Sequence, residues 1–151
     1  MKIYIILALV AFTSATEWKR KTMEEWRQIH ITCDERFNVS QHIIEKSKDE
    51  KYPPKEMFEI VLCILRDVEV WNDTDGFSVD RLMIATNKVT TKYNINKQIF
   101  RDYIESCADK NIEGSNPLDW AYRCFKCFKD NEKLFKVLKK AKFYEDQDEN
   151  V

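Results

Sequence analysis

Hydrophobic residues along this chain recur every three or four positions, and polar residues fill the intervals between them. The pattern is clearest over residues 118–128, where one stripe contains Leu118, Ala121, Cys124, Phe125 and Phe128. Asn116 and Pro117 precede this stripe, so a capping residue comes before the proline that a first helical turn tolerates. We therefore predict a helix here that is apolar enough to lie inside the protein.

The same periodicity predicts helices along the rest of the chain. They cover residues 17–37, 41–47 and 54–68, then run from Ser78 through Val89, from Asn94 or Asn96 to 107, and from Asp130 or Asn131 to 143. Residues 72–76 have the composition of a turn. No segment alternates convincingly with a period of two, and no linker divides the chain. The sequence therefore predicts a single all-α domain of six to seven helices.

Composition supports the helical prediction and narrows the classes of partner. The 151 residues include only 2 glycines and 3 prolines, which disfavours a turn-rich β architecture. The 25 basic and 26 acidic residues nearly cancel. We therefore expect neither nucleic acid nor an anionic membrane to be the main partner.

The amino terminus has the pattern of a secretory signal peptide. Lys2 is followed by an apolar run from Ile3 to Phe12, and then by small residues that end at Ala15. This run is too short to span a bilayer. We predict that residues 1–15 are a signal peptide, that residues 16–151 form the helical domain, and that the protein is secreted without stable membrane insertion.

Secretion into an oxidising compartment makes the cysteines candidates for disulfides. The chain contains Cys33, Cys63, Cys107, Cys124 and Cys127. Because five is odd, at least one of them has no partner within the chain. The last two form a Cys-Phe-Lys-Cys run in the middle of a predicted helix. A thioredoxin-type redox site needs its first cysteine at a helix amino terminus that follows a strand, so we do not expect one here.

The cysteine spacing resembles that of the odorant-binding protein family of insects. That family joins six cysteines first to third, second to fifth and fourth to sixth. The first, third, fourth and sixth are matched here by Cys33, Cys63, Cys107 and Cys127. The resemblance therefore implies two bridges, Cys33–Cys63 and Cys107–Cys127, with Cys107–Cys124 as the alternative to the second. The two remaining family cysteines would fall at Glu59 and Leu118. Losing both ends of one bridge resembles the four-cysteine branch of the family.

The resemblance implies a carrier that binds a small hydrophobic molecule reversibly in an internal cavity and serves olfaction. It needs no cofactor or metal, is a monomer or weak dimer, and has an olfactory receptor as a candidate partner. The candidate cavity residues on the apolar helix faces are Ile29, Val61, Leu65, Met83, Thr86, Phe100, Ile104, Ala121, Cys124, Phe128 and Leu134. Thr86, Tyr103 and Tyr122 are candidate polar contacts. Without the third bridge, we expect a cavity that deforms more easily than in six-cysteine relatives.

Two other classes of function are weighed against the carrier. An enzyme is not expected, because a secreted hydrolase of this size would need a catalytic histidine and a calcium loop. His30 and His42 lie beside isoleucines, and a calcium loop through Gly76 would begin at Trp71 and end at Leu82, which cannot ligate the ion as required. His30 can still act as a pH sensor of ligand release. An interaction protein of the venom, salivary or seminal type, built on the same scaffold, stays open.

Overall fold

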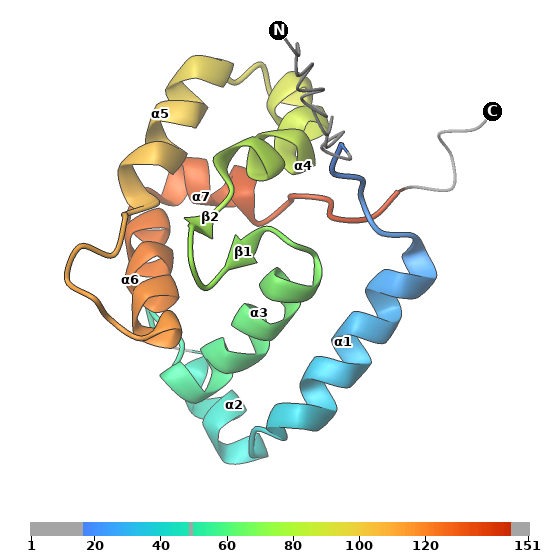
Figure 1. Cartoon of the computed structure of the whole chain (residues 1–151), viewed down its shortest axis with the longest axis vertical. Helices are drawn as coiled ribbons and strands as arrows, with labels where there is room; N and C mark the ends of the chain where they lie inside the picture. Colours follow the sequence, from blue (N-terminus) through green and yellow to red (C-terminus); the bar gives the residue numbers. More distant parts are fainter. Residues whose placement is uncertain (1–16, 49, 146–151) are drawn as a thin grey trace, which may run out of the picture.

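The computed structural model describes residues 17–48 and 50–145, so the predicted signal peptide and the acidic tail beyond residue 145 lie outside the described residues. The described elements are α1 (Met23–Phe37), α2 (Gln41–Ser47), α3 (Lys55–Asp67), β1 (Trp71–Asn72), β2 (Gly76–Phe77), α4 (Val79–Lys92), α5 (Lys97–Cys107), α6 (Pro117–Asp130) and α7 (Glu132–Leu138). The all-α prediction is confirmed, and Figure 1 shows the helices arranged around the small hairpin. None of the described helices is both long and apolar enough to cross a membrane.

Asparagine side chains cap three of the helices where the sequence places a start. The side chain of Asn96 accepts hydrogen bonds from the backbone of Gln98 and Ile99, which decides between the two predicted starts of α5. Asn116 Oδ1 accepts from the backbone N–H of Asp119 at 2.9 Å, and Asn131 caps α7 in the same way. These bonds satisfy amide groups that have no partner inside the helix.

The first helix begins later than the predicted residue 17, because Thr22 caps it. Thr22 Oγ1 accepts from the backbone N–H of Glu25 at 3.2 Å, and the carboxylate of Glu25 accepts from the backbone N–H of Thr22 at 2.7 Å. This reciprocal pair is a capping box. The preceding Lys21 instead pairs with the far end of the chain in a parallel β-bridge to Tyr144.

The last helix ends at Leu138, five residues before the predicted end at Phe143. Beyond it, the backbone N–H of Lys142 donates to the carbonyl of Ala85 in α4 at 2.9 Å. The backbone N–H of Lys21 donates to the carbonyl of Phe143, also at 2.9 Å. These long-range bonds replace the bonds that a continued helix would make. Figure 1 shows the segment after α7 crossing the molecule to reach the described amino-terminal residues.

The predicted turn at residues 72–76 is the tip of a two-stranded antiparallel hairpin, whose strands of 2 residues each are too short to show a period-two alternation. Trp71 pairs with Phe77, and Asn72 pairs with Gly76. Gly76 has φ +78°, and a Cβ atom there would lie 2.5 Å from the Trp120 ring. Only glycine combines this backbone conformation with such a close approach. The hairpin therefore carries Trp71 into the core, where it meets Trp120 edge to face at 4.7 Å between ring centroids.

Two disulfides join helices that are distant in sequence. Cys33–Cys63 connects α1 to α3, and Cys107–Cys127 connects α5 to α6. These are the pairs that the resemblance implies, and Cys124 is a buried free thiol. In the chain-entropy picture, loops of this size give about 3–4 kcal/mol of stabilisation each. The bridges therefore fix α1 against α3 and α5 against α6.

Candidate ligand-binding cavity

An apolar cavity of about 130 Å³ lies between α3, β2, α4, α6, α7 and the segment that follows α7. Six of the nine phenylalanines of the chain line it, together with four aliphatic residues and one lysine. The lining residues are Phe58, Val61, Leu65, Phe77, Leu82, Phe125, Phe128, Phe135, Leu138, Lys139 and Phe143. Such a concentration of aromatic rings around one hollow favours a ligand that offers apolar surface.

Helical spacing explains how residues far apart in the chain come to share this cavity. Phe58, Val61 and Leu65 lie three and four positions apart on α3, so they occupy one face of that helix. Phe125 and Phe128 follow the same rule on α6. The rings pack against one another, with Phe58 and Phe125 centred 5.0 Å apart. The cavity is therefore the space that these packed faces leave between them.

The cavity wall offers almost no hydrogen-bonding group. Lys139 is the one lining residue with a polar side chain, and it is exposed overall. The predicted polar contacts are engaged elsewhere: Thr86 Oγ1 donates to the carbonyl of Leu82 at 2.7 Å, and Tyr122 donates to the carbonyl of Pro53 at 2.6 Å. Tyr103 donates to the carbonyl of Phe128, and burial raises the pKa of its hydroxyl. The side chains that a ligand would contact in this cavity are therefore almost entirely hydrocarbon.

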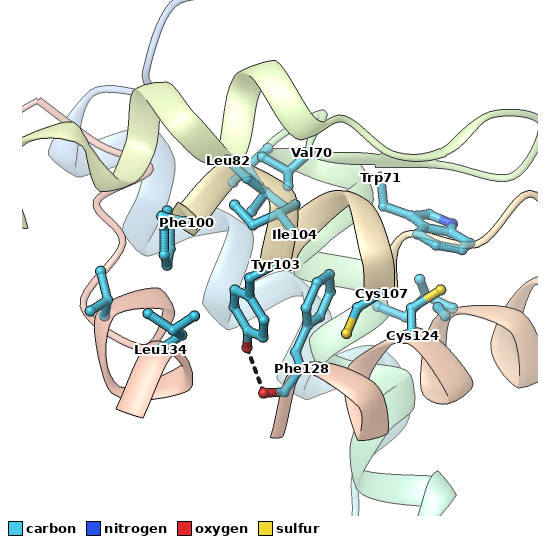
Figure 2. Close-up of a cluster of buried hydrophobic side chains, with 14 of the residues drawn as sticks. Val70, Trp71, Leu82, Phe100, Tyr103, Ile104, Cys107, Cys124, Phe128 and Leu134 are labelled. Atoms are coloured by element: carbon cyan, nitrogen blue, oxygen red, sulfur yellow. Dashed lines mark hydrogen bonds between the residues drawn. The ribbon is translucent and has the colours of Figure 1, made fainter. Parts of the chain in front are cut away.

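Three of the predicted wall residues, Val61, Leu65 and Phe128, line this cavity. Another group belongs to the close-packed core instead, as Figure 2 shows: Phe100, Ile104, Cys124 and Leu134 lie among the buried side chains, and Ala121 is also fully buried. Thr86 is buried on α4 with its hydroxyl bonded to its own helix. Ile29 packs half-buried against the core, and Met83 lines a separate surface groove beside Arg101.

The helix faces predicted from the sequence broadly point inward, and α3 turns its predicted residues Val61 and Leu65 toward this cavity, whereas most of the other predicted residues lie outside its wall. On α6, Ala121 and Cys124 turn toward the packed core, whereas Phe125 turns toward the cavity. The cavity residues that the prediction omitted include Phe77 of β2, Phe135 of α7 and Phe143 of the segment after α7. The clustering of phenylalanines in the last third of the chain was the available signal.

Cys124 lies close to a salt-bridged loop on the core side of α6. Its Sγ atom is 3.6 Å from Oδ2 of Asp109, and its side chain is 1% exposed. Burial is the main cause that raises the pKa of the Cys124 thiol to about 11. The same Asp109 carboxylate accepts hydrogen bonds from the Arg123 guanidinium. The environment of Cys124 therefore suits an inert, buried thiol.

Phe143 connects the cavity to α1. Its ring lies 5.9 Å from the ring of Trp26, centroid to centroid, and Trp26 in turn meets His30 edge to face at 4.4 Å. The Nε2 atom of His30 is buried and has no hydrogen-bond partner among the described residues. Trp26 and His30 therefore pack behind Phe143, in the segment that closes one side of the cavity.

Comparison with known proteins gives one family and several relatives. A profile of the PBP/GOBP family matches residues 15–131. Odorant-binding protein 22 of Aedes aegypti is 25% identical over 132 residues, which covers 87% of this chain and 91% of the relative. General odorant-binding protein 99a of Drosophila melanogaster is 21% identical over 84% of this chain and 88% of its own length. General odorant-binding protein 99b of the same fly is 24% identical over 85% and 91%.

Proposed function

The chain belongs to the PBP/GOBP family, and from this premise we propose that it is a secreted carrier, not an enzyme, that binds small hydrophobic molecules reversibly in the apolar cavity. The resemblance seen in the cysteine spacing agrees with this family at the level of insect odorant-binding proteins. The observation that carries the proposal is the composition of the cavity wall, in which ten of the eleven lining residues are apolar.

The size of the cavity bears on the ligand. An engineered apolar cavity of about 150 Å³ accommodates benzene, whereas sites for drug-sized ligands measure about 300 Å³ or more. At about 130 Å³, the cavity takes only a very small ligand unless its walls move. Val61 is 38% exposed at the cavity, and Phe143 belongs to a segment outside the helices. These two residues are the parts of the wall that can yield most easily to a larger molecule.

The same plasticity follows from assigning the chain to the four-cysteine branch. In this assignment, Glu59 and Leu118 would stand at the positions of the two missing family cysteines; the first lies on α3 and the second near the start of α6. Both helices contribute wall residues to the cavity. Without a covalent link there, α3 and α6 can separate further than in a relative that has the third bridge. We expect lower hydrogen-exchange protection in these two helices than in such a relative.

A cavity-filling variant tests the proposal directly. Val61→Phe places a phenyl ring at the cavity. Because Val61 is partly exposed, we expect this substitution to lower the free energy of unfolding by no more than about 0.5 kcal/mol. We expect the affinity for the apolar fluorescent probe N-phenyl-1-naphthylamine to fall at least about tenfold. Ile84→Phe is the matched control, because Ile84 is 41% exposed and lines a different groove on α4. Equal affinities in the two variants would contradict the assignment of the cavity as the binding site.

Secretion and partners complete the proposal. Residues 1–15 would be removed as a signal peptide, and the domain beginning at residue 16 would act as a monomer or weak dimer that carries its ligand toward an olfactory receptor. The competing function is a secreted interaction protein that sequesters a partner. Displacement of the probe by volatile or fatty molecules favours the carrier. A protein that binds no such molecule, yet captures a protein partner from its native fluid, favours the alternative.

His30 is proposed as the sensor that makes ligand binding depend on pH. Its Nε2 atom is buried and has no hydrogen-bond partner in the described part of the chain, and its ring packs against Trp26, which contacts Phe143 of the closing segment. A proton at this position would place an unpaired charge beneath that contact, and burying such a charge is costly. Probe affinity in the native protein would then decline as the solution is acidified. A flat profile, or the same decline in His30→Phe, would remove His30 from this role.

A further inference from the structure

A basic groove on the surface lies on the other side of the segment that closes the cavity. Its larger hollow, of about 530 Å³, lies between the end of α4 and residues 139–144. A second hollow of about 340 Å³ continues it along α7, and Tyr93 and Lys140 line both. Five lysines line the first hollow and three line the second; because Lys140 is shared, the groove contains seven of the 18 lysines in the chain.

Backbone and side-chain bonds hold the walls of the groove in place. The hydrogen bond from the Lys142 backbone N–H to the carbonyl of Ala85 fixes residues 139–144 against α4. The ammonium group of Lys140 donates to the Tyr93 hydroxyl at 2.8 Å and lies 4.5 Å from the centre of its ring. The groove is therefore a formed feature of the fold, and one lysine spans the boundary between its two hollows.

Charge in the groove is unbalanced, although charge in the whole chain is not. The lining of both hollows contains no acidic residue. Across residues 17–48 and 50–145, no carboxylate forms an ion pair with Lys92, Lys136 or Lys139. The hydrogen bond from Lys140 lowers the pKa of the Tyr93 hydroxyl, which is the effect expected where positive charge accumulates. Some of these lysines complement the negative, carboxyl-terminal ends of the α4 and α7 helix dipoles. Lys139, Lys140 and Lys142, however, lie beyond the end of either helix.

The floor of the groove is apolar. Val89 and Val137 are 9% and 6% exposed, and Ile95 lies half-buried beside them. Lysine side chains can lay their methylene stems along such a floor and keep their ammonium groups at the rim. An apolar floor below a cationic rim is complementary to a molecule with a hydrocarbon body and an anionic head. A bare inorganic anion would leave the floor uncovered.

We propose that this groove is a second binding site, for a small amphiphilic anion with a carboxylate, sulfate or phosphate head. Lys92 from the first hollow and Lys136 from the second would supply positive charge to the head, and the valines and Ile95 would cover the apolar body. A flat lipid surface fits less well, because the lysines line a hollow and do not project from a convex face. The site does not depend on occupation of the apolar cavity.

The test uses n-decyl sulfate as the probe and n-decanol as its uncharged counterpart. Binding of each molecule is monitored through the amide NMR chemical shifts of the full domain. We expect decyl sulfate to shift Tyr93, Ile95 and Val137, and its affinity to fall as salt rises from about 50 to about 500 mM, since added salt screens exposed charges. Decanol should shift the cavity residues and leave those three amides unchanged. Shifts confined to the cavity residues for both probes would overturn the second site while leaving the carrier function intact.

A matched pair of double variants tests the lysines. Lys92→Gln with Lys136→Gln should weaken decyl sulfate binding about 3- to 10-fold, the range expected for two exposed charge contacts. Lys19→Gln with Lys110→Gln makes the same change in net charge at exposed positions outside the groove and should leave the affinity unchanged. Equal weakening in both pairs would overturn the proposal. So would binding to vesicles containing about 30% phosphatidylserine with no binding to soluble decyl sulfate, because that result would indicate a membrane surface.

Discussion

Phe143 faces two partners at once: its ring lies 5.9 Å from that of Trp26 on α1, and the same side chain lines the apolar cavity. Truncation to alanine should therefore open the cavity on this side. We expect Phe143→Ala to release N-phenyl-1-naphthylamine about tenfold faster and to lose about 1–2 kcal/mol of unfolding free energy, less than a fully buried phenylalanine would. Stopped-flow dissociation and urea titration measure the two effects.

The neighbouring Tyr144 provides the control for this variant. Its ring also lies near Trp26, at 5.5 Å, but it lines the basic groove and not the cavity. Tyr144→Ala should reduce stability in a similar way and leave probe dissociation unchanged. If both variants release the probe equally fast, the contact with Trp26, and not the cavity wall, controls the rate.

The buried thiol of Cys124 should react slowly whether or not a ligand is present. With a pKa of about 11, its thiolate population at pH 8 is about two orders of magnitude below that of an ordinary thiol. Its 1% exposure slows a bulky disulfide reagent further. We expect labelling within minutes only in denaturant. Rapid labelling of the native protein that a ligand suppresses would place Cys124 at the binding site after all.

The Asp109–Arg123 pair should make stability sensitive to acid. The guanidinium donates to both carboxylate oxygens, at 2.9 and 3.1 Å, and these hydrogen bonds are the main cause that lowers the pKa of Asp109. A carboxyl with a lowered pKa binds fewer protons in the folded state. Its contribution to stability is therefore present above the unfolded pKa of about 3.9 and is lost as pH falls below that value.

Removal of the arginine should reveal this dependence. Because both side chains are about one-third exposed, we expect Arg123→Gln to cost only about 0.5–1 kcal/mol at pH 7. The difference from the native protein should shrink in urea titrations as the pH falls below about 4. Lys110→Gln, next to Asp109 in the same loop, is the control for net charge. A pH-independent difference would show that Arg123 acts through packing alone.

Restoring the missing bridge tests the assignment to the four-cysteine branch. Glu59 and Leu118 lie on helices that are joined nearby by the Lys55–Asp119 ion pair and by the edge-to-face contact of Phe58 with Tyr122. The double variant Glu59→Cys, Leu118→Cys, made with Cys124→Ala to prevent mispairing, should form a third disulfide. We expect about 1–3 kcal/mol of added stability and stronger hydrogen-exchange protection of α3 and α6. Two thiols that persist after oxidation would argue against matching these positions.

Local signals in the sequence predicted most helix starts, and long-range backbone pairing explains the error at the end of α7. Asn116 and Pro117 indicate the start of α6, and in the structure Asn116 caps this helix and Pro117 is its first residue. Thr22 followed by Glu25 is also a local signal, the pattern of a capping box, and it indicates the observed start of α1. The end of α7 is different in kind. Nothing near Leu138 indicates that Lys142 and Phe143 will bond to Ala85 and Lys21.

The candidate cavity is harder to predict than the fold, because the inward face of one helix can contact both the packed core and the cavity. Periodicity identifies which side of α6 is apolar, but Cys124 and Phe125 are adjacent in sequence and meet the core and the cavity respectively. The contribution of Phe77 depends on the hairpin that delivers it. The nearly balanced charge of the chain likewise gives no indication that lysines gather in one groove, because a net charge does not say where the charged residues lie in the fold.

The segment after α7 separates two environments with a wall one residue thick. Phe143 faces the cavity, while Lys142 and Tyr144 on either side of it face the groove. Pairing with Lys21 and Ala85 sets the phase of this alternation. Inserting or deleting a single residue between Lys139 and Lys142 would exchange inside for outside, turning an ammonium group toward the phenylalanines and a bare phenyl ring toward water. The length of this segment is therefore more tightly constrained than the identity of most side chains in it.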